Sequence, residues 1–209
     1  AMGLDKNLIY FPFREERTSA EEARPVDPMQ LEALERLQAA GSQEPLLVVA
    51  PVKALLQKTM SRQALEQSRW VVKRGESTDR DTMLEMLISE GYHRTNMVER
   101  RGEFSARGDI LDIYPITGQP VRVELFGDEV ESIRHFNLDT QRSVAEIQEF
   151  SVSPISHEDE GSYLVDFFPR GSLVCLEEPA QLRLQTLEWS HEGWHGEWGD
   201  FLALLTPFR

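Results

Sequence analysis

The first part of the chain has the hydrophobic pattern of an α/β fold. Residues 8–11 are a short apolar run that predicts a strand. A helix is predicted from Asp27 to Gly41, because Asp27 can cap free backbone N–H groups and leucine recurs at every third position over 31–37. Residues 46–50 are apolar throughout, which predicts a strand buried on both faces of a parallel sheet.

From Trp70 onward the pattern changes to one helix followed by short strands. Thr78 and Asp81 have the spacing of a capping box, and Gly91 ends the predicted helix. Its apolar face is predicted to hold Met83, Leu84, Leu87 and Ile88. Strands are predicted at 96–99, 103–106, 109–114, 121–126, 132–136 and 147–152. This part therefore predicts an α+β domain, rich in short antiparallel strands and inserted into the α/β one.

One of these strands has a clear alternation. In residues 121–125 the odd positions are apolar and the even positions are charged. Because side chains alternate between the two faces of a strand, one face should pack on a core. Arg122 and Glu124 should then face solvent or a partner.

The last part returns to the earlier pattern. Strands are predicted at 163–165 and 173–176, and a helix at 180–189. We therefore predict three segments: a partial α/β domain at 1–69, the inserted domain at 70–156, and a return to the α/β domain with an aromatic-rich tail at 157–209.

The charge of the chain excludes some functions. It has 36 acidic and 22 basic side chains, a net charge of -14, and no segment that is basic overall. Such a balance repels nucleic-acid phosphates, so DNA binding would need a strong local basic stripe. Cys175 is the only cysteine, which excludes an intrachain disulfide, and no apolar run reaches membrane-spanning length. We expect a cytoplasmic monomer with no membrane partner.

One motif suggests a zinc enzyme. Residues 191–195 read His-Glu-Gly-Trp-His, the H-E-x-x-H pattern in which two imidazoles bind zinc and the glutamate is a general base. Gly193, Gly196 and Gly199 disfavour the helix that such a site needs, and no third ligand follows at the usual spacing. We therefore predict no metal site, and expect Trp189, Trp194 and Trp198 to pack onto the body of the protein or onto sequence outside this chain.

Nucleotide chemistry has no support either. The chain has neither a Gly-x-x-x-x-Gly-Lys-Ser/Thr loop nor a Gly-x-Gly-x-x-Gly turn, so nothing cradles a phosphate. Glu177 and Glu178 are better explained as negative charges that stabilise a helix N-terminus than as magnesium ligands. We expect no cofactor and no enzymatic activity.

The remaining candidate is a cluster of arginines. Arg94, Arg100, Arg101 and Arg107 lie close together in sequence, and Arg122 and Glu124 share an outward strand face. Arginine is enriched in binding hot spots because it pairs with carboxylates in a bidentate manner. A solvated face with local Arg/Glu pairs is an equally good explanation of the pattern.

Longer stretches carry a family resemblance. Residues 101–115 (RGEFSARGDILDIYP) and 121–134 (VRVELFGDEVESIR) resemble the module shared by the excision-repair protein UvrB and the bacterial transcription-repair coupling factors, and the similarity covers most of 45–180. Two departures favour the coupling factors. The DNA-inserting, tyrosine-rich hairpin of UvrB has no aromatic counterpart between Phe13 and Pro28, and Glu177-Glu178-Pro179-Ala180 replaces its acid box. The resemblance implies a degenerate, ATP-inactive, helicase-like domain derived from a P-loop fold.

The resemblance also implies a partner. In the family the inserted domain docks onto UvrA, a damage-scanning ATPase, and the contacting positions correspond here to Arg94, Arg107, Arg122 and Glu124. Ser105 stands where UvrB has another arginine. RNA polymerase and DNA would be contacted only by other parts of the full-length protein. The alternatives are a UvrB-type fragment that contacts damaged DNA and the disfavoured zinc hydrolase.

Overall fold

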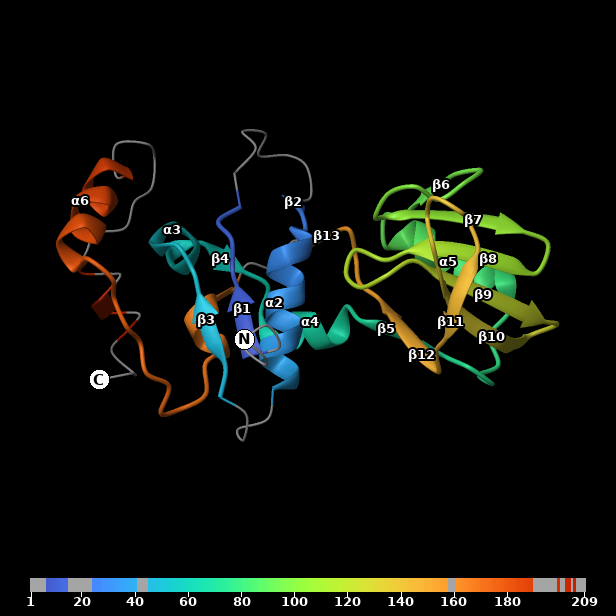
Figure 1. The fold of residues 1–209 in the computed structure, drawn as a ribbon, viewed down its shortest axis with the longest axis horizontal. Coiled ribbons are helices and arrows are strands. Elements are labelled where there is room, and N and C mark those ends of the chain that lie inside the picture. Colours follow the sequence, from blue (N-terminus) through green and yellow to red (C-terminus); the bar gives the residue numbers. More distant parts are fainter. Residues whose placement is uncertain are drawn as a thin grey trace. The chain divides into compact units, whose positions relative to one another are not determined.

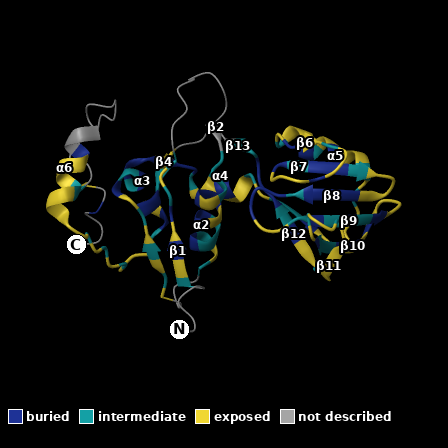
Figure 2. Ribbon diagram, turned by 45° about the horizontal axis from the view of Figure 1, so that its top comes forward, coloured by how far each residue is buried: buried dark blue, intermediate teal, exposed yellow. Residues whose placement is uncertain are grey.

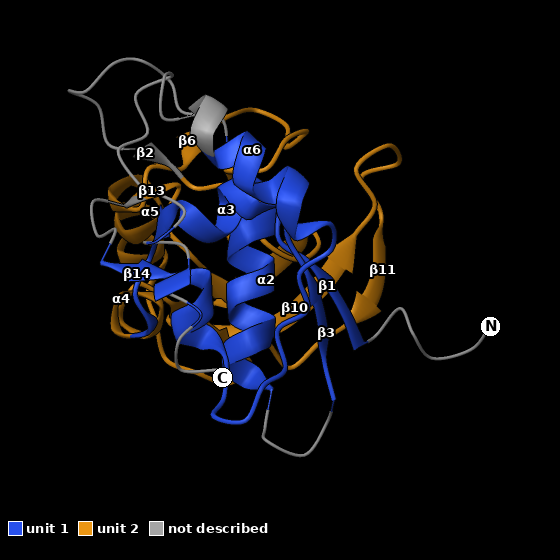
Figure 3. Cartoon of the chain, turned by 90° about the vertical axis from the view of Figure 1, so that its left-hand side faces the viewer, with its two compact units in different colours: residues 1–20, 29–62, 159–209 blue, residues 21–28, 63–158 orange. Residues whose placement is uncertain are grey.

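The computed structural model describes residues 7–14, 24–40, 45–157 and 161–189, together with 199, 202, 203 and 205. The chain divides into two compact units, coloured separately in Figure 3. Unit 1 comprises 1–20, 29–62 and 159–209, and unit 2 comprises 21–28 and 63–158. The inserted segment was predicted to span 70–156, and unit 2 adds a few residues before it and a short stretch from the N-terminal region.

Unit 1 is built around a parallel strand pair. β1 (Leu8–Tyr10) pairs with β3 (Leu47–Val49), and the chain between them contains α2 (Pro28–Ala39). The predicted leucine stripe of α2 is buried, with Leu31, Leu34 and Leu37 at most 7% exposed. Ile9 and Phe11 are also fully buried in this unit. The 3.6-residue period therefore predicts the packed face of α2 correctly.

The predicted burial of β3 on both faces is wrong. Leu47 is 56% exposed and Val49 is 47% exposed. Among the described strands β3 pairs with β1 alone, so its second edge carries no neighbour. The residues of β3 line an open groove of ≈ 1370 Å³. An apolar run shows that a strand can be buried. Whether it is buried depends on the helices or strands that pack on its faces and edges.

The rest of unit 1 is made of short elements. They are α3 (Val52–Leu56), β4 (Lys58–Thr59), β14 (Ser162–Tyr163), the 3₁₀ turn η1 (Leu164–Phe167) and α6 (Pro179–Trp189). β14 pairs antiparallel with β4. Val52, Leu56 and Val165 form a small core with Leu205. Helix α4 (Arg62–Gln67) begins at the last residue of the 29–62 segment of unit 1 and continues into unit 2.

Two strand predictions in this region are wrong, whereas the helix at 180–189 is confirmed as α6. The predicted strand at 163–165 stops at Tyr163, because the Asp166 carboxylate accepts a 2.7 Å hydrogen bond from the Tyr163 backbone N–H and turns the chain into η1. Residues 173–176 form no strand, and Leu173 is 86% exposed. Their apolar run lines the groove beside β3 without pairing to it.

Unit 2 contains a six-stranded sheet, shown with its labels in Figure 1. Its order is β11-β10-β9-β8-β7-β6, antiparallel except for the parallel pair β6 and β7. The strands are β6 (His93–Arg94), β7 (Glu103–Arg107), β8 (Ile110–Tyr114), β9 (Val121–Phe126), β10 (Glu129–Phe136) and β11 (Ser143–Glu146). Two further antiparallel pairs complete the unit: β5 (Trp70–Lys73) with β12 (Glu149–Val152), and β2 (Arg24–Pro25) with β13 (Ser156–His157).

The two faces of this sheet differ in character, and Figure 2 shows its central strands β7 and β8 largely in the colour of buried residues. One face is apolar, and Phe104, Leu111, Ile113 and Val123 on it are 0% exposed. Helix α5 (Arg80–Ser89) lies behind the sheet and contributes the fully buried Met83 and Leu87. The other face carries the polar residues of the same strands. The predicted alternation in β9 is therefore confirmed, since Val121, Val123 and Leu125 are buried and Arg122 and Glu124 take the opposite face.

Helix α5 begins and packs differently from its prediction. Asp79, and not Thr78, is the N-cap: its carboxylate accepts hydrogen bonds from the Thr82 hydroxyl (2.6 Å) and backbone N–H (2.9 Å). These two bonds lower the pKa of the Asp79 carboxyl from its usual value. Ile88, predicted on the buried face, is 59% exposed. Thr78 precedes the N-cap by one residue, and its backbone N–H donates a hydrogen bond to the Asp128 carbonyl and not to the Asp81 carboxylate that a capping box would use.

The predicted strand at 96–99 is also wrong, and β6 forms just before it. The Glu103 carboxylate accepts hydrogen bonds from the backbone N–H groups of Glu99 (2.8 Å) and Arg100 (2.9 Å), which bends this segment into a turn. β11 was not predicted because all four of its residues are exposed, so it has no apolar alternation.

Two glycines in turns before and after β7 provide a stability test. Gly102 has φ +79°, and a Cβ there would lie 2.8 Å from Ile155 Cδ1, whereas Gly108 has φ +60° with open space around it. A left-handed backbone costs a non-glycine residue ~1–2 kcal/mol. We expect Gly108→Ala to lose about that amount in urea unfolding, and Gly102→Ala to lose more because Ile155 must also move. Equal losses would mean that the Ile155 contact contributes nothing.

Candidate protein-docking site

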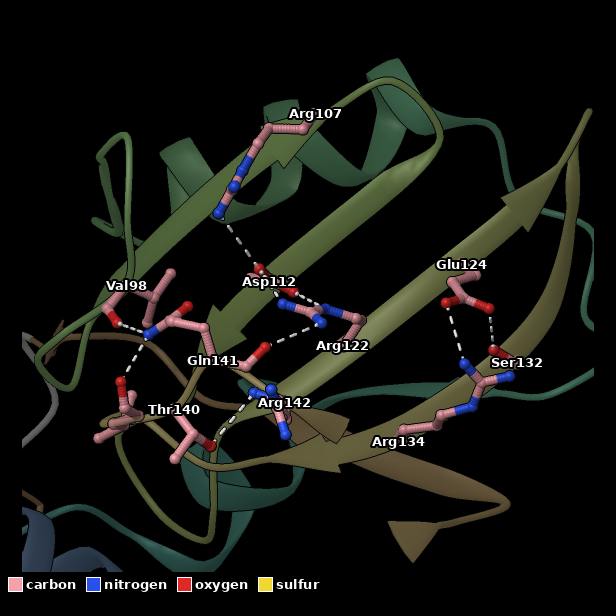
Figure 4. A network of polar contacts seen from close by, with 11 residues as sticks. Val98, Arg107, Asp112, Arg122, Glu124, Ser132, Arg134, Thr140, Gln141 and Arg142 are labelled. Carbon is pink, nitrogen blue, oxygen red and sulfur yellow. Dashed lines mark hydrogen bonds and ion pairs between the residues drawn. The ribbon is translucent and has the colours of Figure 1, made fainter. Parts of the chain in front are cut away.

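The polar face of the sheet carries charged side chains on four adjacent strands (Figure 4). The strand register sets their positions: Ser105 of β7 is opposite Asp112 of β8, which is opposite Arg122 of β9, and Arg122 is opposite Arg134 of β10. Glu124 lies two residues further along β9 than Arg122, on the same face, and is opposite Ser132 of β10. Residues that are far apart in the sequence therefore form one continuous polar surface.

Arg122 and Asp112 form the centre of this surface. Arg122 Nε donates to Asp112 Oδ1 (2.6 Å) and Nη2 donates to Oδ2 (2.8 Å), so the pair is bidentate. The Asp112 side chain is 3% exposed and that of Arg122 is 18% exposed. The hydrogen bond to Asp112 raises the pKa of Arg122 above its usual value, against the opposing effect of burial. Charge-assisted bidentate pairs of this kind are strong and geometrically specific.

Arg122 also fixes the loop after β10. Its Nη1 donates to the Gln141 carbonyl (3.2 Å), and its guanidinium carbon lies 5.2 Å from the centre of the Phe136 ring. The Gln141 side-chain amide in turn donates to the carbonyls of Val98 and Leu138. Arg122 is therefore on the predicted outward face, but its hydrogen-bonding capacity is largely used within the domain.

Glu124 is paired in a similar way. Its carboxylate accepts hydrogen bonds from Arg134 Nη1 (3.0 Å) and the Ser132 hydroxyl (2.8 Å). Arg134 continues the row through a 3.6 Å ion pair with Glu146. Partly exposed pairs each contribute little. Their effect here is that the charges of β9 and β10 neutralise one another.

Arg107 and Arg94 are less constrained. The Arg107 side chain is 62% exposed, and its Nη2 lies 3.7 Å from Asp112 Oδ2, which Arg122 already binds. Arg94 is exposed, and within the described residues it makes no ion pair. The two side chains line the same hollow of ≈ 520 Å³ together with Ser105. The structure thus links Arg107 to Arg122 through Asp112, and Arg107 to Arg94 through the hollow.

The other arginines of the sequence cluster have separate places. Arg101 Nη1 donates to the carbonyls of Pro115 (3.2 Å) and Ile116 (2.7 Å), and its guanidinium stacks over Tyr114 at 4.8 Å. It holds the turn after β8. The Arg100 backbone N–H is bound by Glu103 in the turn before β7.

Phe126 is a candidate that the sequence analysis missed. It is the last residue of β9 and is 78% exposed. The signal was present, because position 126 continues the even-numbered outward positions that include Arg122 and Glu124. Aromatic residues are enriched in binding hot spots, so an exposed phenylalanine on this face is a natural anchor.

Neither a metal site nor a membrane-spanning helix is found among the described residues. They contain no group of three His, Cys, Asp or Glu side chains placed to hold a metal ion. In the same part of the chain, no helix has the length and apolar character that crossing a membrane requires. The H-E-x-x-H motif of residues 191–195, with Trp194 and Trp198, lies outside the described residues.

Comparison with known proteins defines the class of unit 2. Residues 71–157 match the model of the UvrB interaction domain family. This match confirms the resemblance found in the sequence. The match covers the whole six-stranded sheet and α5.

Over 60–72% of its length the chain is similar to transcription-repair-coupling factors. It is 35% identical over 151 residues, 72% of its length, to the protein of Bacillus subtilis, and 39% identical over 125 residues, 60% of its length, to that of Staphylococcus haemolyticus. The Staphylococcus aureus protein is 36% identical over 125 residues. The chain spans 13% of the Bacillus protein and 11% of each Staphylococcus protein.

Proposed function

We propose that the polar face of the unit 2 sheet docks onto UvrA, and that the chain is a non-catalytic recruitment module of a transcription-repair coupling factor. It would bring excision repair to a stalled RNA polymerase. The observation that carries this proposal is the pair of exposed arginines, Arg94 and Arg107, over one hollow in a UvrB interaction domain. The polymerase and DNA would be contacted by other parts of the full-length protein.

The four predicted residues fall into two pairs with different surroundings, and this difference supports docking. Arg122 and Glu124 are held by Asp112, Arg134 and Ser132, so they keep the surface rigid. Arg94 and Arg107 are exposed at the edge of these pairs, and Arg107 makes only the 3.7 Å contact to Asp112. Because the pairs neutralise their own charges, a partner with matching acidic groups would be attracted at these two arginines and not across the whole face.

Unit 1 would then be a scaffold. Its parallel β1 and β3, with α2 between them in sequence, fit a helicase-like domain derived from a P-loop fold. The sequence has no phosphate-binding loop, so we propose that this domain is ATP-inactive. The chain would bind as a monomer and not turn over a substrate.

The direct test is titration calorimetry of the whole chain with purified UvrA. Saturable binding with one chain per UvrA protomer is the expected result, and binding should weaken as salt is raised because arginines contribute to it. No heat and no co-elution on a sizing column at micromolar concentrations would refute the proposal.

Phe126 gives a second test of the same surface. Phe126→Ala is expected to weaken UvrA binding about fivefold, corresponding to about 1 kcal/mol for an apolar anchor. Because Phe126 is 78% exposed, the urea midpoint of the free chain should stay unchanged. Ile88→Ala is the matched control: Ile88 is 59% exposed on α5, behind the sheet, and its removal should leave the affinity unaltered. Equal effects of the two substitutions would move the binding surface elsewhere.

A further inference from the structure

Gln141, in the loop between β10 and β11, has a backbone and a side chain that both carry an energetic cost. Its φ is +57°, a left-handed conformation that glycine adopts freely and other residues do not. Its side-chain Oε1 is enclosed and has no hydrogen-bond partner among the described residues. Strain of this kind clusters at functional sites, and an unsatisfied buried oxygen is uncommon in a native fold. Gln141 therefore calls for an explanation.

The hydrogen bonds of Gln141 join two loops to the sheet. Its side-chain Nε2 donates to the Leu138 carbonyl (2.7 Å) in its own loop and to the Val98 carbonyl (3.2 Å) in the segment between β6 and β7. Its backbone carbonyl accepts a 3.2 Å hydrogen bond from Arg122 Nη1. Figure 4 shows Gln141 between Arg122 and Val98. Reversing the amide would replace both side-chain bonds with contacts between oxygens, so Oε1 stays on the enclosed side.

The segment that Gln141 reaches belongs to the candidate docking site. Residues 95–100 follow Arg94 directly, and the start of this segment lines the same hollow as Arg94. Its far end is fixed by the Glu103 carboxylate, which accepts hydrogen bonds from two of its backbone N–H groups. Gln141 holds its middle, at Val98, from a different loop.

We infer that Gln141 is a positioning residue of the docking face. Its side chain connects Arg122, at the centre of the sheet, to the segment 95–100, and this connection sets the place of the segment beside Arg94. The left-handed backbone directs the carbonyl to Arg122 and the amide to the segment at the same time, which accounts for its cost. The inference rests on the proposed docking function, and it adds a residue that acts without touching the partner.

Packing of Val98 is the competing explanation for the order of this segment. Val98 is 0% exposed, so burial of its side chain would hold the segment without help from Gln141. The two explanations differ in the expected result of removing the Gln141 amide while Val98 is kept. Gln141→Gly makes this change: it keeps the backbone carbonyl that Arg122 binds and relieves the left-handed strain. Its urea midpoint should therefore lie at or above that of Gln141→Ala.

Hydrogen exchange of the free chain, followed by NMR, is the first test. In Gln141→Gly the backbone amides of Glu99 and Arg100 should exchange about tenfold faster than in the parent, because the segment opens locally. The amide of Val123, at the centre of the sheet, should keep its parent rate. Parent rates at Glu99 and Arg100 would overturn the inference, since packing of Val98 alone would then hold the segment. Equal acceleration at Val123 would also overturn it, because the effect would be a general loss of stability.

Two further variants examine the donor role of the amide. Gln141→Glu keeps the size of the side chain but places a carboxylate, which only accepts, against two carbonyl oxygens. It should open the segment at least as much as Gln141→Gly. Asp139→Ala is the matched control, because Asp139 is an exposed residue of the same loop, and it should leave all the exchange rates unchanged. Parent rates in Gln141→Glu would contradict the role of the amide as a donor.

The affinity for UvrA, measured by titration calorimetry with the whole chain, completes the test. Gln141→Gly should weaken binding about fivefold, because the partner must order the segment again on docking. Asp139→Ala should bind like the parent. Faster exchange in Gln141→Gly together with parent affinity would overturn the docking role of Gln141. A parent chain that does not bind UvrA refutes the proposed function, whereas the exchange rates of the free chain still decide whether Gln141 holds the segment.

Discussion

Replacing Arg122 by alanine is expected to lower the free energy of unfolding of the chain by about 3–5 kcal/mol, the usual result of removing one partner of a buried ion pair. Asp112 would remain, with a side chain that is 3% exposed, and would lose both of its short hydrogen bonds. Arg107 lies farther away, at 3.7 Å, and its side chain is 62% exposed, so we expect it to compensate only in part. The Gln141 carbonyl and the Phe136 ring would lose their contact as well. Urea unfolding followed by circular dichroism measures the loss.

The matched control removes both charges. Arg122→Met combined with Asp112→Leu should recover most of the lost stability, because a buried ion pair can often be replaced by apolar side chains at little cost. If Arg122→Ala alone loses less than about 1 kcal/mol, the pair behaves like an exposed salt bridge and its burial has no energetic consequence. Binding data on Arg122→Ala should be interpreted only after this measurement.

Arg107→Ala is expected to weaken UvrA binding at least tenfold while leaving the urea midpoint unchanged. The exposed guanidinium makes one long ion pair in the free chain, so little is lost on its removal. In the complex, by contrast, it would pair with a desolvated carboxylate, and truncating such a contact costs about 2 kcal/mol or more. Titration calorimetry against purified UvrA gives the affinity.

Two further variants locate the effect. Arg100→Ala removes an equal charge from the turn at the other end of β7 and should change the affinity less than about twofold, as rim charges do. Arg107→Lys keeps the charge but loses the bidentate fork, so it should fall between the parent and Arg107→Ala. If Arg100→Ala is as harmful as Arg107→Ala, the attraction is a general effect of charge and not a contact at this site.

Periodic patterns predicted the elements that bury one face. The leucine stripe of α2 and the alternation of β9 are both present in the structure, because each pattern records which side chains leave water. The apolar runs at 46–50 and 173–176 gave wrong predictions of a buried strand. Burial of a strand also requires a second layer of structure packed on it, and the apolar run itself does not show whether that layer is present. Capping was misplaced by one residue because Thr78 and Asp79 are both good N-caps, and the tertiary bond to Asp128 decides between them.

The sequence named the residues of the candidate site, whose contact with UvrA stays a prediction, but it did not give their roles within the sheet. Arg94, Arg107, Arg122 and Glu124 could be named from the family resemblance. That Arg122 is a structural residue follows from the register of β8 and β9, which places Asp112 opposite it. The Ser105 hydroxyl, which is buried without a hydrogen-bond partner among the described residues, could not be predicted either. The sequence shows a serine in a strand, but it does not show whether its hydroxyl forms a hydrogen bond.

The long contact between Arg107 and Asp112 has a consequence for the strength of docking. At 3.7 Å this ion pair is weak, and Figure 4 shows the Arg107 side chain directed across the sheet towards Asp112. An arginine side chain loses conformational entropy worth up to about 2 kcal/mol when it is immobilised. If part of that entropy is already lost in the free chain, less is lost when the complex forms, and the affinity should be higher. Asp112 would thus act as a template that prepares Arg107 for its partner.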